Sequence, residues 1–377
     1  MLTSFCLSPE VVAYREYALC VACVMEWRTV VVIVLVVSLC FFMVPIRVGP
    51  DKNAEDTKLF ADYVAKYNKS YRHDSSEYKE RFDRFQRSLQ YIERLNGFRS
   101  SQESAYYGLT EFSDLSEDEF LQRALLPDLP SRGQAHIAAS YYHRRSKNLI
   151  NRTKRATSVP SKVDWRDKGV VGPIQSQDIC GGCWAFSTIG MAESMYAIKN
   201  GTLYPFSVQE MIDCMPGNFG CQGGDICSLL SWLLMSKTKI ISDSVYPLTR
   251  RNDQCKLSKL LAKTSGVRIT DFTCDSFVDA EDELLIALAT HGPVAAAVNA
   301  MSWQNYLGGV IQYHCDGSFN SLNHAVQIVG YDLSAGIPHY IVKNSWGSTF
   351  GDKGYLYIAI GNNLCGKIIR EILASID

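Results

Sequence analysis

The feature that most constrains the fold is a helix with no polar face, predicted from Trp184 to Asn200. The segment contains no proline, includes good helix formers such as Ala192 and Met195, and is followed by Gly201, which suits the end of a helix. Its apolar residues fall almost all round the helix, so it has no side suited to solvent. We therefore expect a helix packed between two surfaces, which holds its first residue rigidly.

A thiol stands where this helix begins. The run CGGCWAF at residues 180–186 places Cys183 there. The attacking form of cysteine is the thiolate, and an ordinary thiol pKa of about 8.5 leaves little of it in a mildly acidic compartment. The positive end of a helix dipole and a neighbouring imidazolium both lower that pKa. Cys183 is therefore a candidate nucleophile that needs a histidine, and a buried structural thiol is the plainer alternative.

His324 and Asn344 are the candidate partners of this thiol. His324 precedes a strand-like alternation of apolar residues, and Asn344 opens the run NSWG. His291, His314 and His339 also follow the thiol, but their contexts are typical of ordinary surface or core residues. The distance from the cysteine to the histidine matches a signature of cysteine peptidases, and the asparagine lies a little beyond the spacing of that signature, which a modest loop insertion would explain.

With these motifs, the chain resembles the papain-like cysteine peptidases. The resemblance implies that Cys183 is the nucleophile, His324 the general acid/base and Asn344 the residue that orients the imidazole. It implies that Gln177 shares the oxyanion hole with a backbone N–H, and that Trp346 shields the histidine–asparagine bond from water. The expected activity is that of a cysteine endopeptidase, made as a zymogen, which forms an acyl-enzyme intermediate.

The same family implies the partners of the protein. These are protein and peptide substrates, its own propeptide as an inhibitor, and cystatin-like inhibitors. No cofactor and no metal are expected, and a formal charge of −1 argues against nucleic acid as a partner.

Two other functions are compatible with parts of the sequence. Cys180-x-x-Cys183 ahead of a helix is also a thioredoxin-type motif, which would make the protein a thiol–disulfide oxidoreductase. The partner of Cys180 discriminates, because the peptidase family ties it to a distant cysteine. The second alternative is a non-catalytic secreted binding protein on a peptidase fold, although Cys183, His324 and Asn344 are all present.

The 13 cysteines indicate an oxidising setting, lysosomal or secreted. Spacing alone cannot fix their connectivity. Cys227 and Cys274 are either free or a fourth bridge. By resemblance, the other expected disulfides are Cys180–Cys221, Cys214–Cys255 and Cys315–Cys365.

The region before the peptidase divides into three parts. Residues 1–49 are expected to be a tail and signal peptide, or a membrane anchor, because Thr29–Ile46 is apolar and uncharged; Met25 is an alternative start. Residues 50–129 are expected to be a helical inhibitory prodomain, and residues 130–157 a basic linker where activation cleavage occurs. The spacing that resembles the ERFNIN helix of cathepsin proregions comprises Glu77, Arg81, Phe85, Ser88, Ile92 and Asn96.

The mature domain, residues 158–377, is predicted to be α+β with a papain-like two-lobed fold. A helical lobe over about 163–268 would contain a capping box, Ser207-x-x-Glu210, and a β-barrel-like lobe would cover about 269–377. The active site would then lie in the cleft between the lobes. The expected substrate-binding residues are Gly223, Gly224, Ile226, Ala297, Leu322 and Trp346, and the N-glycosylation sequons begin at Asn68, Asn151 and Asn200.

Overall fold

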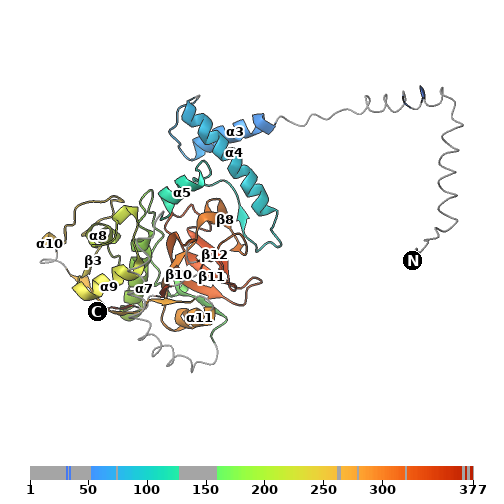
Figure 1. Cartoon of the computed structure of the whole chain (residues 1–377). Coiled ribbons are helices and arrows are strands. Elements are labelled where there is room, and N and C mark those ends of the chain that lie inside the picture. Colours follow the sequence, from blue (N-terminus) through green and yellow to red (C-terminus); the bar gives the residue numbers. More distant parts are fainter. Residues whose placement is uncertain are drawn as a thin grey trace, which may run out of the picture. The chain divides into compact units, whose positions relative to one another are not determined.

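The computed structural model of the chain describes residues 31–32, 34, 52–73, 75–126, 159–260, 265–277, 280–318, 321–366, 370–371 and 374–376 (Figure 1). The chain divides into two compact units, Met1–Leu59 and Phe60–Asp377, and the boundary in the sequence falls within helix α3 (Lys52–Lys66). No helix among the described residues is both long enough and apolar enough to cross a bilayer. Most of the apolar segment at residues 29–46, together with Met25 and the basic linker, lies outside the described residues.

The prodomain part of the second unit is built on an aromatic core. Phe60, Tyr63 and Phe85 are buried together, with Phe60 and Phe85 ring centroids 5.1 Å apart. Asp114 ties the following loop to this core, because it accepts hydrogen bonds from the hydroxyls of Tyr63 (2.8 Å) and Tyr71 (2.7 Å). The elements after α3 are α4 (Ser76–Asn96), β1 (Tyr106–Tyr107) and α5 (Glu117–Ala124).

Two residues of the predicted ERFNIN spacing make the contacts that fix α4. The Arg81 guanidinium binds the Glu119 carboxylate at 2.7 Å, which joins α4 to α5. The Asn96 side chain hydrogen-bonds both backbone groups of Tyr107, at 2.9 Å each, and so fixes β1. The helix is therefore more than amphipathic, because its polar positions anchor the two elements that follow it.

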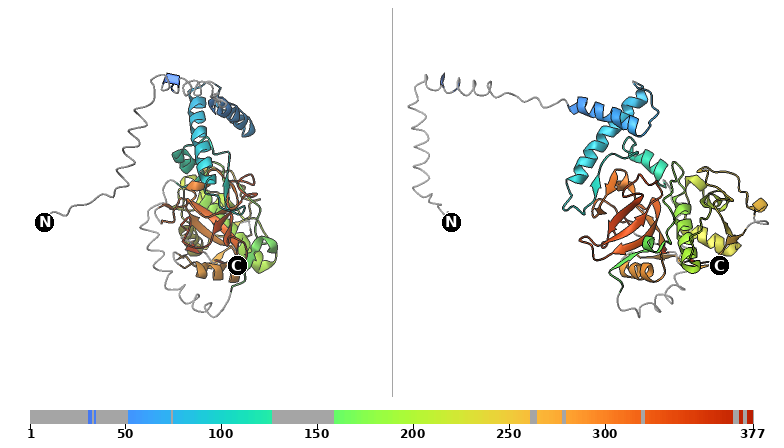
Figure 2. Two further views of the ribbon diagram at one scale, coloured as in Figure 1. Left: turned by 90° about the vertical axis from the view of Figure 1, so that its right-hand side faces the viewer. Right: turned by 180° about the vertical axis from the view of Figure 1, so that it is seen from behind.

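The central helix α7 (Cys183–Asn200) is buried on nearly all sides and ends at Gly201, whose φ of 73° favours glycine. It lies between the helices of one lobe and the sheet of the other (Figures 1 and 2). This is the arrangement that its lack of a polar face predicts. The helical lobe also contains α8 (Val208–Cys214), the 3-10 turn η2 (Gly220–Gln222), α9 (Ile226–Ser236), β3 (Ile240–Ile241), α10 (Leu257–Leu260) and β4 (Gly266–Val267).

The other lobe is built on a six-stranded sheet around β10 (His324–Asp332). The first half of β10 pairs antiparallel with β7 (Val294–Val298), and its middle and second half pair antiparallel with β11 (His339–Lys343). The sheet then continues to β12 (Tyr355–Ala359) and to β9 (Val310–Ile311). The other elements of this region are β5 (Ile269–Phe272), β6 (Asp275–Ser276), α11 (Glu281–Thr290), η3 (Met301–Trp303), β8 (Tyr306–Gly308) and β13 (Arg370–Glu371).

Both ends of the peptidase region cross between the lobes. The strand β2 (Lys162–Asp164), followed by the turn η1 (Trp165–Lys168), pairs with the second half of β10 in the sheet. The last strand, β14 (Ala374–Ile376), pairs with β5, whose Ile269 and Phe272 belong to the apolar core around α7. These long-range pairings hold the two lobes together.

The predicted capping box at Ser207 forms only in part. The Ser207 hydroxyl accepts from the backbone N–H of Glu210 at 3.0 Å, as an N-cap does. The Glu210 carboxylate does not complete the box, because its Oε2 accepts from the N–H of Ile241 at 2.9 Å instead. The buried strand β3 needs a partner for that N–H, and this need outweighs the local cap.

Candidate active site

Cys183 is the first residue of α7, and its thiol is free and fully buried. The chain reaches the helix through a tight approach: the N–H of Gly181 donates to the carbonyl of Cys221 at 2.8 Å. A Cβ on Gly181 would lie 2.6 Å from that oxygen, so only glycine fits there. This close contact and the adjacent disulfide fix the start of the helix and hence the position of the thiol.

The structure contains the three disulfides that the resemblance implies, Cys180–Cys221, Cys214–Cys255 and Cys315–Cys365. A fourth joins Cys227 to Cys274, which resolves the alternative left open by the sequence. Because Cys180 is bonded to Cys221, it is not the redox partner of Cys183 that the oxidoreductase alternative requires.

His324 and Asn344 meet where β10 begins and β11 ends. His324 Nε2 donates to Asn344 Oδ1 at 2.8 Å, and the imidazole packs against the indole of Trp346 with ring centroids 4.8 Å apart. The bond leaves Nδ1 as the unprotonated nitrogen of a neutral ring, and no described residue hydrogen-bonds this buried atom. The residue after the histidine, Ala325, directs its backbone N–H at the Cys183 sulfur. The two lobes therefore bring the thiol and the imidazole into one buried site.

Gln177 lies on the other side of this site and is fully buried. Its Oε1 accepts from the Ser345 hydroxyl at 2.6 Å. Its Nε2 donates to two carbonyls, that of Cys180 at 3.0 Å and that of Ala124 at 3.2 Å. Both polar atoms of the Gln177 amide therefore have hydrogen-bond partners.

The end of the prodomain covers the site. Ala124, which occupies a donor of Gln177, is followed by Leu125 and Leu126, both almost inaccessible. The N–H of Leu126 donates to the carbonyl of Asn323 at 2.6 Å, directly before the histidine. Leu126 also joins the apolar core that contains the thiol. Ala124 and Leu126 thus hydrogen-bond to Gln177 and Asn323, which belong to different lobes.

Burial shifts the pKa values of both Cys183 and His324. Burial raises the pKa of the Cys183 thiol to about 12, although the N–H groups of Ala325 and Trp184 oppose the shift. Burial lowers the pKa of His324 to about 4, against the opposing effect of its bond to Asn344. Burial therefore opposes the charged form of both groups in this structure, whereas the ion pair that the sequence predicts needs both charged forms.

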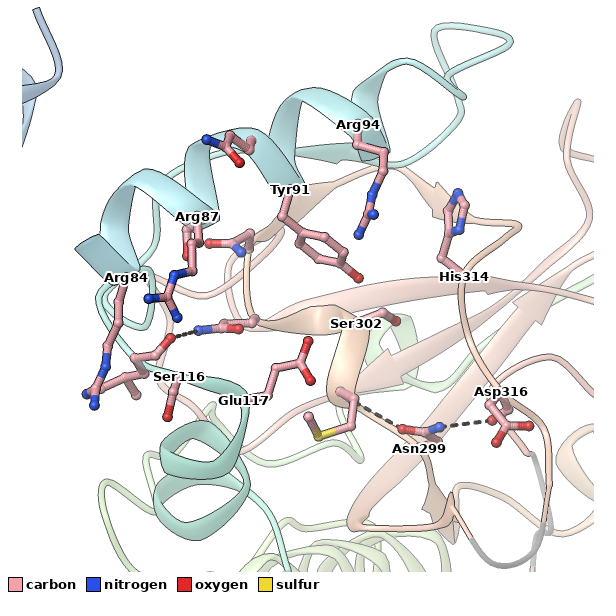
Figure 3. A pocket seen from close by; sticks show the side chains of 16 residues that line it. Arg84, Arg87, Tyr91, Arg94, Ser116, Glu117, Asn299, Ser302, His314 and Asp316 are labelled. Carbon is pink, nitrogen blue, oxygen red and sulfur yellow. Dashed lines mark hydrogen bonds between the residues drawn. The ribbon is translucent and has the colours of Figure 1, made fainter. Parts of the chain in front are cut away.

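Further contacts hold the prodomain to the sheet lobe. Strand β1 pairs antiparallel with β8, and the Gln304 side chain donates to the carbonyls of Phe112 (2.7 Å) and Leu115 (3.0 Å). Phe112 and Phe120 each meet the ring of Trp346 edge-on, at 5.5 Å. A cavity of about 770 Å³ remains beside these contacts, between α4, α5 and the segment 299–316 (Figure 3). Its charged lining residues are three arginines and two acids, so positive charge is in slight excess: Arg84, Arg87, Arg94, Glu117 and Asp316.

Comparison with known proteins agrees with this geometry. A family model described as papain family cysteine protease matches residues 159–375, and one described as cathepsin propeptide inhibitor domain matches residues 60–120. This chain is a papain family cysteine protease.

Relatives of the papain family cover both its propeptide and its peptidase region. Human cathepsin O is 41% identical over 293 residues, which cover 78% of this chain and 86% of the relative. Mouse cathepsin O is 40% identical over 278 residues, covering 72% and 82%. Among solved structures, a digestive procathepsin L2 from Tenebrio molitor larval midgut superposes with a TM-score of 0.72 at 28% identity, covering 85% of this chain and 99% of that one. The fold is therefore the papain-like α+β fold preceded by an inhibitory propeptide.

Most of the residues expected to bind substrate are buried in the structure. Ile226 shares the apolar core of Leu126, Ala297 is paired with Ala325 across β7 and β10, and Leu322 is buried just before Asn323. Gly224 has no room for a side chain, because a Cβ would lie 2.5 Å from the Trp184 ring.

The backbone of Gly223 is less available than the sequence suggested. Its N–H donates to Gly220 at 3.3 Å and its carbonyl accepts from Phe219 at 2.8 Å. A substrate strand would have to displace these bonds to pair with Gly223. Of the sequon asparagines, Asn68 and Asn200 are exposed, and Asn151 lies outside the described residues.

Three groups of the site escaped the sequence analysis. They are the Ser345 hydroxyl, the Asn323 carbonyl and the Ala325 N–H. Two are backbone groups, which carry no residue-specific signal. The serine belongs to the recognised NSWG run, but its bond to Gln177 joins segments far apart in the chain.

Proposed function

We propose that this cysteine endopeptidase uses Cys183 as its nucleophile and His324 as its general acid/base. The observation that carries the proposal is the single described free thiol at the start of α7, brought to the edge of β10 where the histidine begins the strand. The histidine is oriented by Asn344, which takes its Nε2–H and leaves Nδ1 free to exchange a proton with sulfur.

The catalytic cycle then has two parts. The Cys183 thiolate attacks the scissile carbonyl while Gln177 Nε2–H stabilises the oxyanion, and His324 protonates the leaving amine. Water deprotonated by the same imidazole hydrolyses the acyl-enzyme. The packing of the imidazole on Trp346 supports a shielding role for that indole, because it keeps water from the His324–Asn344 bond.

The prodomain inhibits by occupying the groups that substrate needs. The carbonyl of Ala124 takes the Gln177 donor that would meet the oxyanion, and Leu126 belongs to the same apolar core as Cys183. When the prodomain leaves, water would enter the site again. The pKa values of the thiol and the imidazole would then return toward their ordinary range, which allows the ion pair to form.

The contacts of Leu126 also support the choice of substrate. Its packing with Ile226 indicates that this side of the site accepts an apolar side chain, and Gly224, Ala297 and Leu322 complete our proposed substrate-binding surface. We place the enzyme in the lysosome or outside the cell, in keeping with its disulfides and exposed sequons, where cystatin-like proteins would be its inhibitors.

Covalent labelling tests the proposal. After acid activation, an epoxysuccinyl inhibitor should label Cys183 and abolish hydrolysis of a fluorogenic peptide, whereas Cys183→Ala should neither be labelled nor hydrolyse. His324→Ala should lose nearly all activity, while His291→Ala, a partly exposed histidine of the same lobe, should keep it. Activity that survives in Cys183→Ala would refute the assignment.

The role of Gln177 has its own measurement. Deleting one oxyanion donor costs on the order of 100-fold in kcat. Gln177→Ala should therefore lose about that much kcat for peptide hydrolysis, and a near-normal kcat would remove this residue from the mechanism.

A further inference from the structure

Asp178 and Ile179 form an exposed pair directly after Gln177, and the catalytic roles above use neither residue. Ile179 is 70% exposed and Asp178 is exposed as well, although the prodomain covers the neighbouring thiol. Among the described residues, the backbone N–H of Asp178 has a partner, the Ser176 hydroxyl at 3.2 Å, but its carboxylate has no hydrogen bond or ion pair. A carboxylate beside an apolar side chain therefore faces solvent next to the site.

The backbone of Asp178 adopts a conformation that favours glycine. Its φ is 55°, in the left-handed region that few side chains other than those of asparagine and aspartate tolerate. The carboxylate therefore occupies this position at some cost in backbone strain, and residues strained in this way gather at functional sites. The bond from its N–H to Ser176 fixes the turn, so the carboxylate projects from a defined position.

The pairing of Ser176 places Asp178 on the Trp346 side of the active site. Ser176 forms an isolated antiparallel bridge with Trp346, whose indole packs against the His324 imidazole at 4.8 Å. His324 protonates the leaving amine in our proposed mechanism, so the part of the substrate after the cleaved bond passes on this side. Asp178 and Ile179 therefore flank the path of the leaving segment.

The charges around Asp178 belong to both parts of the zymogen. Burial raises the pKa of the prodomain residue Glu111, the ammonium of Lys69 opposes this shift, and the Asp178 carboxylate adds to it. Lys69 also donates to the Glu111 carbonyl at 2.7 Å. On the peptidase side, Arg250 donates through Nε to the Ser176 carbonyl at 2.7 Å and forms no ion pair with Asp178 in the described structure. When the prodomain leaves, Glu111 and Lys69 leave with it, and Asp178 becomes available to a cation from the substrate.

We propose that Asp178 and Ile179 select a lysine or arginine in the leaving segment of the substrate. The aliphatic part of such a side chain would lie along Ile179, and its charged end would pair with the Asp178 carboxylate. The inference rests on the proposed mechanism, because His324 defines the leaving side. An ion pair at an exposed position is weak, so the selectivity should be about threefold in kcat/KM and should shrink at high salt.

Internally quenched peptides test this selectivity. They share one sequence with a single cleavable bond and carry lysine, norleucine or glutamate at one of the first three positions after that bond. Norleucine keeps the aliphatic part of lysine without its charge. The mature enzyme is made from the full-length zymogen, and its active fraction is counted with an epoxysuccinyl inhibitor. At one of these positions we expect kcat/KM to be about threefold higher for lysine than for norleucine, and lower again for glutamate.

Two variants separate the charge from the apolar surface. Asp178→Asn removes the charge and keeps a residue that tolerates a positive φ, so the ratio of kcat/KM for lysine over norleucine should fall from about three to about one. Ile179→Ser should lower kcat/KM for both of these peptides by about twofold and keep their ratio. The matched control is Asp167→Asn, which neutralises an exposed aspartate in the turn η1 and should leave the ratio at about three.

Four results would overturn the inference. Lysine and norleucine could give equal kcat/KM at all three positions. The lysine preference could persist in Asp178→Asn. That variant could also lower kcat/KM for every peptide by the same factor, which would mean a disturbance of the adjacent Gln177. Loss of the preference in Asp167→Asn would assign it to the overall charge of the enzyme. Failure of the proposed function looks different, because Cys183 would then escape labelling by the inhibitor and no peptide would be cleaved.

Discussion

The contact between Phe120 and Trp346 makes the strength of prodomain inhibition open to measurement. Phe120 lies in the middle of α5 and is fully buried. Its ring centroid is 5.4 Å from that of Phe112, in the prodomain, and 5.5 Å from that of Trp346, in the peptidase region. Truncating a buried Phe to Ala costs about 3–5 kcal/mol. We assign about half of this, ~2 kcal/mol, to docking, since the ring packs against both partners. Because 1.4 kcal/mol is tenfold, Phe120→Ala should raise the population of released prodomain about 30-fold.

The assay is the time course of activation at acidic pH, followed with a fluorogenic peptide at several zymogen concentrations. Phe120→Ala should activate up to about 30-fold faster, and the mature enzyme should be identical to wild type because the substituted segment has been removed. Phe98→Ala is the matched control. This prodomain Phe is 54% exposed and its ring meets that of His314 edge-on, so its change should be within about twofold. Unchanged activation in Phe120→Ala, or equal acceleration in Phe98→Ala, would refute the reasoning.

Four further predictions concern titration and covalent structure. Because burial raises the pKa of Cys183 and lowers that of His324, the zymogen should show no thiolate absorbance at 240 nm between about pH 5 and 9, and the absorbance should appear when the prodomain is removed. The pKa of His324 falls from 6.5 to about 4, so its contribution to zymogen stability is complete above pH 6.5 and lost as pH falls through 4, which acid-dependent thermal unfolding should reveal. Burial raises the pKa of Glu210 to about 8, so the contribution of this group to stability is complete below pH 4.5 and lost as pH rises through 8. Glu210→Gln should therefore unfold at a higher temperature than wild type at pH 7.5 and lose this pH dependence. A lower unfolding temperature at that pH would contradict this prediction. Replacing Cys227 and Cys274 together by Ser opens a loop with a sequence separation of 47 and should lower the free energy of unfolding by about 2–4 kcal/mol, measured by urea titration, while labelling of the free thiol stays normal.

Local patterns predicted the elements on which the site is built. Helix α7 follows from a proline-free apolar segment that ends at Gly201, and the strand beginning at His324 follows from the apolar residues after it. Such features depend on neighbours within one or two turns, or on alternation along one strand, so the sequence contains the information. The proposed catalytic residues were identified in the same way, because their motifs are short.

Tertiary structure decided the contacts that join distant segments. Glu210 bonds the N–H of Ile241 instead of completing its cap, and Ser345 donates to Gln177, because a buried polar group takes whichever partner the fold brings near. The pairing of Cys227 with Cys274 is of the same kind, since spacing does not determine which cysteines meet.

The sequence by itself therefore determined the helix, the thiol at its start and the identity of the partner residues. Only the tertiary structure decided the state in which they are held. Desolvation depends on every atom packed around a group, and here those atoms include Ala124, Leu125 and Leu126 of the prodomain. Burial raises the pKa of Cys183 and lowers that of His324, and both shifts oppose the ion pair that the residue types alone suggest.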